Sequence, residues 1–147
     1  MPRIKLREQS VYKFHFDVVI QPRDVNYSGH LGHDALISLV HCARADLFRS
    51  LGVSEMDLGD GRTAIIMSDL AVNYRGEGFM FEPVRIESHV DEVTRNGFRL
   101  FHRLIKDGQV LALVETGLLA YDYPQRKIVH VPQAFIEALA RISPKET

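Results

Sequence analysis

The sequence predicts an α+β protein in which an antiparallel sheet packs on, or wraps around, one long helix. Three observations lead to this prediction: a single apolar stripe with helical spacing, several segments with the character of strands, and two hairpin signals between them, Asn96-Gly97 and Asp107-Gly108. Strands joined by consecutive hairpins run antiparallel. The length of 147 residues predicts one domain, and a content of 46% hydrophobic and 25% charged residues is typical of globular chains.

The first strand and the helix come early in the chain. Apolar and polar residues alternate from Tyr12 to Ile20, the period expected of a half-buried strand. Turn-forming residues fill positions 21–29. A helix is expected from about Gly32 to Leu51, with Gly52 as its stop. Its apolar stripe consists of Leu36, Leu39, Val40, Ala43 and Leu47.

Four strands and a short helix complete the prediction. The strands are expected at Thr63–Tyr74, Val84–Val93, Phe98–Lys106 and Gln109–Tyr121. The last of them is apolar almost throughout, which is typical of a central strand covered on both faces. Pro132 fits the first turn of a short terminal helix.

Composition excludes several function classes. A net charge of −1, with no block of one sign, argues against a nucleic-acid partner. The longest aliphatic run, Val110 to Val114, is far shorter than a membrane span. Cys42 is the only cysteine, so neither an intrachain disulfide nor a cysteine-based zinc site can form, and its place in the helix favours a plain buried thiol. Because the charged N-terminus has no apolar core of signal-peptide length, we expect a cytoplasmic protein.

One constellation carries chemistry, the segment from Asp24 to Asp34 between the first strand and the helix. The first amides of a helix have no internal partner and can hold an oxyanion. Asn26, His30, His33 and Asp34 supply an amide, two imidazoles and a carboxylate there. Glycines allow close approach of a ligand to the backbone, and they stand here at Gly29 and Gly32.

These residues also have plainer interpretations. Asn26 and Asp34 would serve equally well to shape the turn and to favour the helix dipole. His30 and His33 have metal-like spacing, but no third ligand stands at a recognisable distance, so we expect no metal. His41 lies two turns further along the helix, where it either faces the same cleft or lies at the surface.

The segment 26–34 resembles the signature of the hotdog-fold acyl-CoA thioesterases of the 4-hydroxybenzoyl-CoA thioesterase type. Segments 70–75, 82–87, 106–108 and 127–132 resemble later parts of that family, so the resemblance covers about residues 10 to 135. It implies that residues 1–147 form one hotdog domain, a sheet wrapped around the long helix. It further implies a homodimer or homotetramer with active sites at the dimer interface, and no cofactor other than the coenzyme A of the substrate.

The resemblance also implies roles for individual residues. The thioester carbonyl would accept a hydrogen bond from the backbone amide of His33. Asn26 stands where these enzymes carry a catalytic aspartate, and a neutral amide cannot act as a base. The base would then be Asp34, followed by His33, with His41 and an Asp69 reaching over from a second chain as further choices. Arg75 and Arg99 are the candidates for contacting the phosphates of coenzyme A.

Two other functions compete with hydrolysis. A hydratase or dehydratase on the same fold would carry a different motif, a histidine followed by a Pro-Gly pair, which is absent here. A non-catalytic acyl-CoA binding or sensing protein fits the loss of aspartate at Asn26. The aromatic and methionine side chains of Phe79, Met80 and Phe81 would line an acyl pocket, or belong to the core or to an interface.

Overall fold

The computed structural model describes residues 3–142 and contains all the expected elements. Strand β1 (Phe14–Val19) leads through a single 3₁₀ turn, Pro22–Asp24, to helix α1 (His33–Ser50). The remaining elements are β2 (Ala64–Tyr74), β3 (Pro83–Asp91), β4 (Gly97–Lys106), β5 (Gln109–Asp122), a short β6 (Lys127–Ile128) and helix α2 (Gln133–Arg141). None of the helices within residues 3–142 is both long and apolar enough to cross a bilayer.

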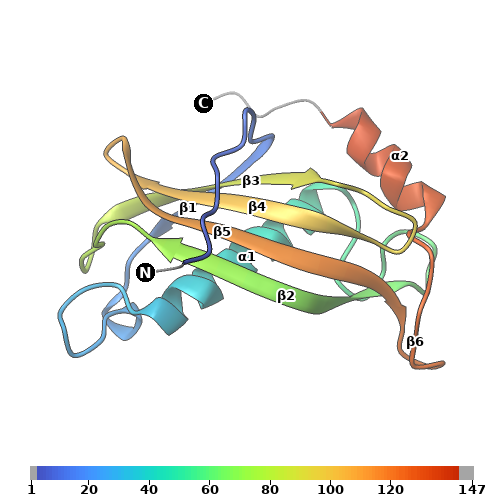
Figure 1. Ribbon diagram of the computed structural model, residues 1–147, viewed down its shortest axis with the longest axis horizontal. Coiled ribbons are helices and arrows are strands. Elements are labelled where there is room, and N and C mark those ends of the chain that lie inside the picture. The colour runs from blue at the N-terminus through green and yellow to red at the C-terminus, as the bar shows by residue number, and fades with distance from the viewer. Residues whose placement is uncertain (1–2, 143–147) are drawn as a thin grey trace.

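The strands form one antiparallel sheet with the order β1-β3-β4-β5-β2, and β6 pairs with β5. The sheet curls around α1, and α2 lies at one end, as Figure 1 shows. This arrangement confirms the hotdog fold that the resemblance implied. It leaves β2 as the strand at one edge of the described sheet.

The apolar stripe of α1 packs against the inner face of the sheet. Leu36, Val40, Ala43 and Leu47 are buried as expected, whereas Leu39 is only partly buried. The prediction of a buried Cys42 was wrong, because this thiol is exposed. At 100° per residue, position 42 points away from the stripe together with the exposed positions 38, 45 and 49.

The two hairpin signals differ in outcome. Asp107-Gly108 forms the expected two-residue turn, in which both residues have positive φ, 49° and 74°. Asn96-Gly97 does not: the loop between β3 and β4 is longer, and Gly97 already pairs with Leu119. Gly97 is required for a different reason, since a Cβ there would lie 2.5 Å from the Leu118 carbonyl oxygen.

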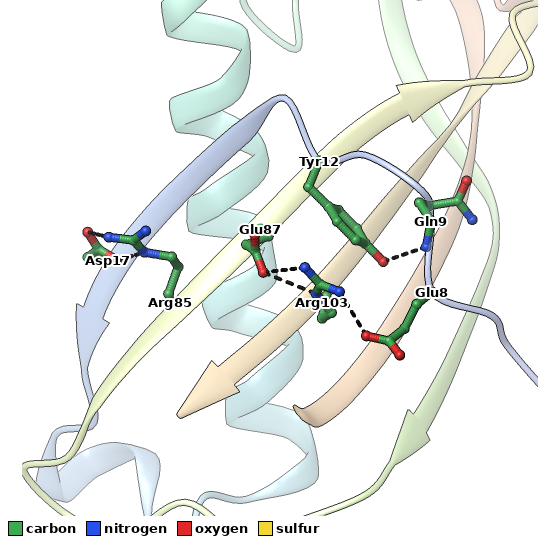
Figure 2. A network of polar contacts seen from close by, with 7 residues as sticks. All are labelled: Glu8, Gln9, Tyr12, Asp17, Arg85, Glu87 and Arg103. Carbon is green, nitrogen blue, oxygen red and sulfur yellow. Dashed lines mark hydrogen bonds and ion pairs between the residues drawn. The ribbon is translucent and has the colours of Figure 1, made fainter. Parts of the chain in front are cut away.

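Residues 3–12, the N-terminal strap, cross the outer face of the sheet (Figure 1). The side chain of Asn73 accepts a hydrogen bond from the Leu6 amide and donates one to the Ile4 carbonyl oxygen, both at 2.8 Å. Glu8 binds Arg103, which also binds Glu87 and lies 4.5 Å from the centre of the Tyr12 ring. Figure 2 shows this polar network. The strap is thus fixed to the sheet near both of its ends.

Candidate functional site

The loop before α1 is folded back on itself by its own hydrogen bonds. The backbone N–H of Asn26 donates to the His30 carbonyl oxygen at 3.2 Å. Gly29, with a φ of 86°, closes the turn between these two residues. The backbone N–H of Leu31 donates to the Gly78 carbonyl oxygen, and this hydrogen bond ties the loop to the segment after β2. As a result, Asn26 lies beside the first turn of α1.

A cavity of about 390 Å³ opens between this loop, the start of α1 and the segment that follows β2. Four of the ten candidate site residues line it: Asn26, His30, His33 and Arg75. The rest of the wall comes from Leu31, Leu36, Tyr74, Gly76, Glu77, Gly78 and Leu111. The cavity therefore gathers polar groups from two segments about 45 residues apart in sequence over an apolar floor.

The start of α1 is open to this cavity. Its N-cap is Gly32, and no side chain caps the helix, so the amides of the first turn keep their capacity to donate. A Cβ on Gly32 would lie 2.8 Å from Asp34 Oδ1 and 3.6 Å from Asn26 Nδ2. Glycine thus leaves room for the Asp34 carboxylate at the helix start, where the positive end of the dipole favours negative charge, and the Asn26 side chain lies within van der Waals distance of the same point.

The Asn26 side chain presents its NH₂ group. Its oxygen Oδ1 accepts hydrogen bonds from the Ser28 amide, at 3.0 Å, and from the Ser28 hydroxyl. No described group accepts a hydrogen bond from Nδ2. Asn26 is therefore arranged as a donor at the helix start, next to the free backbone amide of His33.

His30 and Glu77 form a pair across the cavity. His30 Nδ1 lies 3.0 Å from the Leu31 carbonyl oxygen, an acceptor that requires a proton on Nδ1. In the neutral ring, Nε2 then carries the lone pair. It lies 3.9 Å from Glu77 Oε1, and both side chains are partly exposed.

Tyr74 links the end of β2 to the helix start. Its hydroxyl donates to the His33 carbonyl oxygen at 3.1 Å. Burial, and secondarily the negative charge of Asp34, raises the pKa of the Tyr74 phenol above its ordinary value, so it stays protonated. Asp34 itself is exposed and is not among the residues that line the cavity.

His41 does not face this cavity. Its Nε2 lies 3.3 Å from Glu55 Oε1, which also accepts a hydrogen bond from Arg44 at 2.7 Å. Eight residues after His33, the helix has turned far enough to bring His41 to the acidic side chain of the following loop instead. Within one chain, His41 is an exposed histidine beside Glu55.

Asp69 and Arg99 also lie elsewhere, on the outer face of the sheet, where they bind each other at 2.6 Å. This ion pair lies directly above Gly117, where there is no side chain to block it. A Cβ at position 117 would lie 1.9 Å from Asp69 Oδ1. Hydrogen bonds from Arg99 hold the pKa of the Asp69 carboxyl below its ordinary value. Arg99 also binds Glu115 at 2.7 Å, so its charge is already neutralised.

Two cavity residues with polar side chains had no role in the sequence analysis, Tyr74 and Glu77. The available signal was the run Tyr74-Arg75-Gly76-Glu77-Gly78, in which two small residues flank a carboxylate directly after a strand. Phe79, Met80 and Phe81 follow that run and are exposed outside the cavity. Within residues 3–142, no group of three or more His, Cys, Asp or Glu side chains is arranged to hold a metal ion.

Known structures with the same fold include several thioesterases. A 1,4-dihydroxy-2-naphthoyl-CoA thioesterase from Synechocystis superposes with a TM-score of 0.79 at 15% identity, over 87% of this chain and 96% of the other. A DHNA-CoA thioesterase from Staphylococcus aureus superposes with a TM-score of 0.77 at 20% identity, over 87% of this chain and 89% of the other. A gentisyl-coenzyme A thioesterase superposes with a TM-score of 0.75 at 16% identity, over 85% of this chain and 98% of the other.

At these identities the superpositions show the fold alone. No curated protein matches the sequence. The sequence pattern of the thioesterase-like superfamily matches residues 20–139, which include β2 to β6, α1 and the whole cavity. This chain belongs to the thioesterase-like superfamily.

Proposed function

We propose that this protein hydrolyses an acyl-CoA thioester to a free acid and coenzyme A. The observation that carries the proposal is the uncapped start of α1, which opens into the cavity beside the Asn26 NH₂ group. Two donors at that point suit the negative charge that develops on a thioester oxygen. Membership of the thioesterase-like superfamily supports this assignment.

In the proposed reaction, the thioester oxygen accepts hydrogen bonds from the His33 amide and from Asn26 Nδ2. Water adds to the carbonyl carbon and transfers a proton to a base, which forms a tetrahedral oxyanion. The carbon–sulfur bond then breaks, the carbonyl re-forms, and sulfur leaves with the electron pair and is protonated. A thiol has a pKa of about 8.5, so it leaves with little help from an acid.

For the base we propose His30, whose Nε2 lone pair lies in the cavity wall. The Leu31 carbonyl oxygen orients the ring, and the Glu77 carboxylate, 3.9 Å from Nε2, stabilises the imidazolium that forms. His33 also lines the cavity and is the second choice. Asp34, the first choice under the resemblance, is exposed and does not line the cavity, so it ranks below both histidines.

Thiol release tests the proposed reaction. We expect wild-type protein, incubated with a panel of acyl-CoAs and a thiol reagent, to release coenzyme A with saturation kinetics. Asn26→Ala removes one donor to the oxyanion and should lower kcat by about 10- to 1,000-fold while the fold is retained. Circular dichroism spectra that match the wild type establish that the variant is folded.

The alternative is a protein that binds acyl-CoA without cleaving it. The absence of a carboxylate at Asn26, the position of the family's catalytic aspartate, favours this second function. Tight binding of acyl-CoA by calorimetry, with no thiol release from any thioester of the panel, would establish it. Unchanged turnover in Asn26→Ala would remove Asn26 from the mechanism.

We further propose that two chains pair through their sheets. The exposed edge of β2 supports this, since an unpaired edge strand offers a row of free backbone groups, and Met67 and Leu70 on it are 40% and 39% exposed. Sedimentation equilibrium should give twice or four times the chain mass of 16.7 kDa. A single-chain mass at micromolar concentration would refute this assembly.

A further inference from the structure

A second cavity, of about 760 Å³, lies beside the first and is lined by four cations: Arg3, Lys5, Arg7 and Arg75. Its other walls are Leu6, Val72, Asn73 and Tyr74, and none of the lining residues is acidic. Tyr74 and Arg75 line both cavities, so the two adjoin at the end of β2. In Figure 1 the start of the strap lies beside the arrowhead of β2.

The strap holds its three cations at this place. Arg3, Lys5 and Arg7 alternate with Ile4 and Leu6, the period of an extended chain. Asn73 fixes the backbone between them through Ile4 and Leu6, and Arg103 holds the strap at Glu8. The three cations are thus attached to a segment bound to the sheet at two points.

These cations differ from three arginines of the neighbouring sheet surface, each of which has a carboxylate partner. Arg85, Arg99 and Arg103 are paired with Asp17, Asp69 and Glu87 at 2.9, 2.6 and 2.8 Å. Within residues 3–142, no hydrogen bond or ion pair engages the side chains of Arg3, Lys5, Arg7 or Arg75. In a chain with a net charge of −1, four unpaired cations around one cavity create a local positive field that a multiply charged anion would neutralise.

We propose that this second cavity binds the phosphate groups of the nucleotide part of coenzyme A, while the thioester lies in the first cavity. The assignment to coenzyme A rests on the proposed function. The chemistry recognised is a clustered phosphoanion, which guanidinium and ammonium groups bind through charge-assisted hydrogen bonds. The N-terminal strap then serves as a binding element for the substrate in addition to covering the sheet.

The test uses the variant Arg3→Gln/Lys5→Gln/Arg7→Gln, in which three exposed side chains lose their charge. A matched control, Arg95→Gln/Arg126→Gln/Lys127→Gln, removes three exposed cations, two from loops and one from the short strand β6. We expect the Kd for coenzyme A to rise about 10-fold in the strap variant at low salt, and not in the control, because each exposed ion pair contributes modestly. The difference should shrink as salt screens the charges.

Kinetics separate the nucleotide from the acyl part of the substrate. In the strap variant we expect KM for an acyl-CoA to rise about 10-fold with kcat unchanged. An acyl-pantetheine thioester, which lacks the phosphates, should react equally with wild type and variant. Equal loss with both substrates would mean that the strap only supports the fold, and the proposal would be wrong.

Two further outcomes are decisive. If inorganic pyrophosphate binds through these cations while coenzyme A binds the variant as tightly as the wild type, the site takes a free phosphoanion and the assignment to coenzyme A fails. If wild type binds coenzyme A in a strap-dependent manner but releases thiol from no thioester, the nucleotide site is supported and hydrolysis is refuted.

Discussion

Replacing His30 with glutamine should lower kcat by about 100- to 10,000-fold, the range usual for loss of a general base. Glutamine keeps a polar side chain of similar reach but has no site that accepts a proton near neutral pH. The substituted residue is partly exposed, so the fold should be retained. Single-turnover measurement of thiol release, with the enzyme at saturating excess over acyl-CoA, gives the rate of the chemical step.

Three other variants identify the base by comparison. Glu77→Gln should have a smaller effect than His30→Gln, because it removes only the carboxylate beside Nε2. His41→Gln is the matched control on the same protein, since His41 binds Glu55 away from the cavity, and its kcat should equal that of the wild type. If Asp34→Asn abolishes turnover while His30→Gln is active, the choice made from the sequence is right and the role of His30 is wrong.

The fold was predictable because its signals are local and strong. The alternation in the first strand, the 3.6-residue stripe of α1 and the Asp107-Gly108 turn each depend on neighbouring residues, and each is present in the structure. The Asn96-Gly97 turn failed because a long-range contact, the approach of the Leu118 carbonyl oxygen, accounts for that glycine. Cys42 failed because its place in the middle of the helix was read without its position around the axis.

The site was only partly predictable, for the same reason. Asn26, His30 and His33 are close in sequence and follow one another around the helix start, so they could be grouped from the sequence. Glu77 and Tyr74 reach the cavity because β2 ends beside the helix start, where the Leu31 backbone N–H binds the Gly78 carbonyl oxygen. These contacts join segments about 45 residues apart in sequence, which no local pattern reveals. The pairing of Asp69 with Arg99 likewise depends on strand register, since β5 places Gly117 between them.

The largest expected effect on stability comes from His102, which lies between α1 and the centre of the sheet. It is 1% exposed; its Nδ1 is 2.7 Å from Ser88 Oγ, and its Nε2 has no hydrogen-bond partner. Burial, and secondarily the positive charge of Arg44, lowers the pKa of the imidazole from 6.5 to about 3. Protonation would place a second positive charge in the core, with an N–H group that has no acceptor.

The sign of the pH dependence follows from these pKa values. Between about pH 6.5 and pH 3 the unfolded chain carries a proton on this histidine that the folded chain does not, so the free energy of unfolding falls as the pH falls. From pH 7 to pH 5 the expected loss is about 2 kcal/mol, with a slope that approaches about 1.4 kcal/mol per pH unit. Urea denaturation at intervals of half a pH unit measures this loss, and the interval from pH 7 to pH 5 lies above the range in which most carboxylates titrate.

His102→Asn isolates this contribution. Asparagine can keep a hydrogen bond to Ser88 but does not titrate, so the variant should be less stable at pH 7 and should lose most of the slope from pH 7 to 5. His89 contributes the remaining slope, because burial also lowers its pKa. His130→Asn, which changes an exposed histidine, should retain the slope of the wild type. A wild-type free energy that is flat over this interval, or an equal slope in His102→Asn, would mean that water reaches the ring and that the core tolerates its charge.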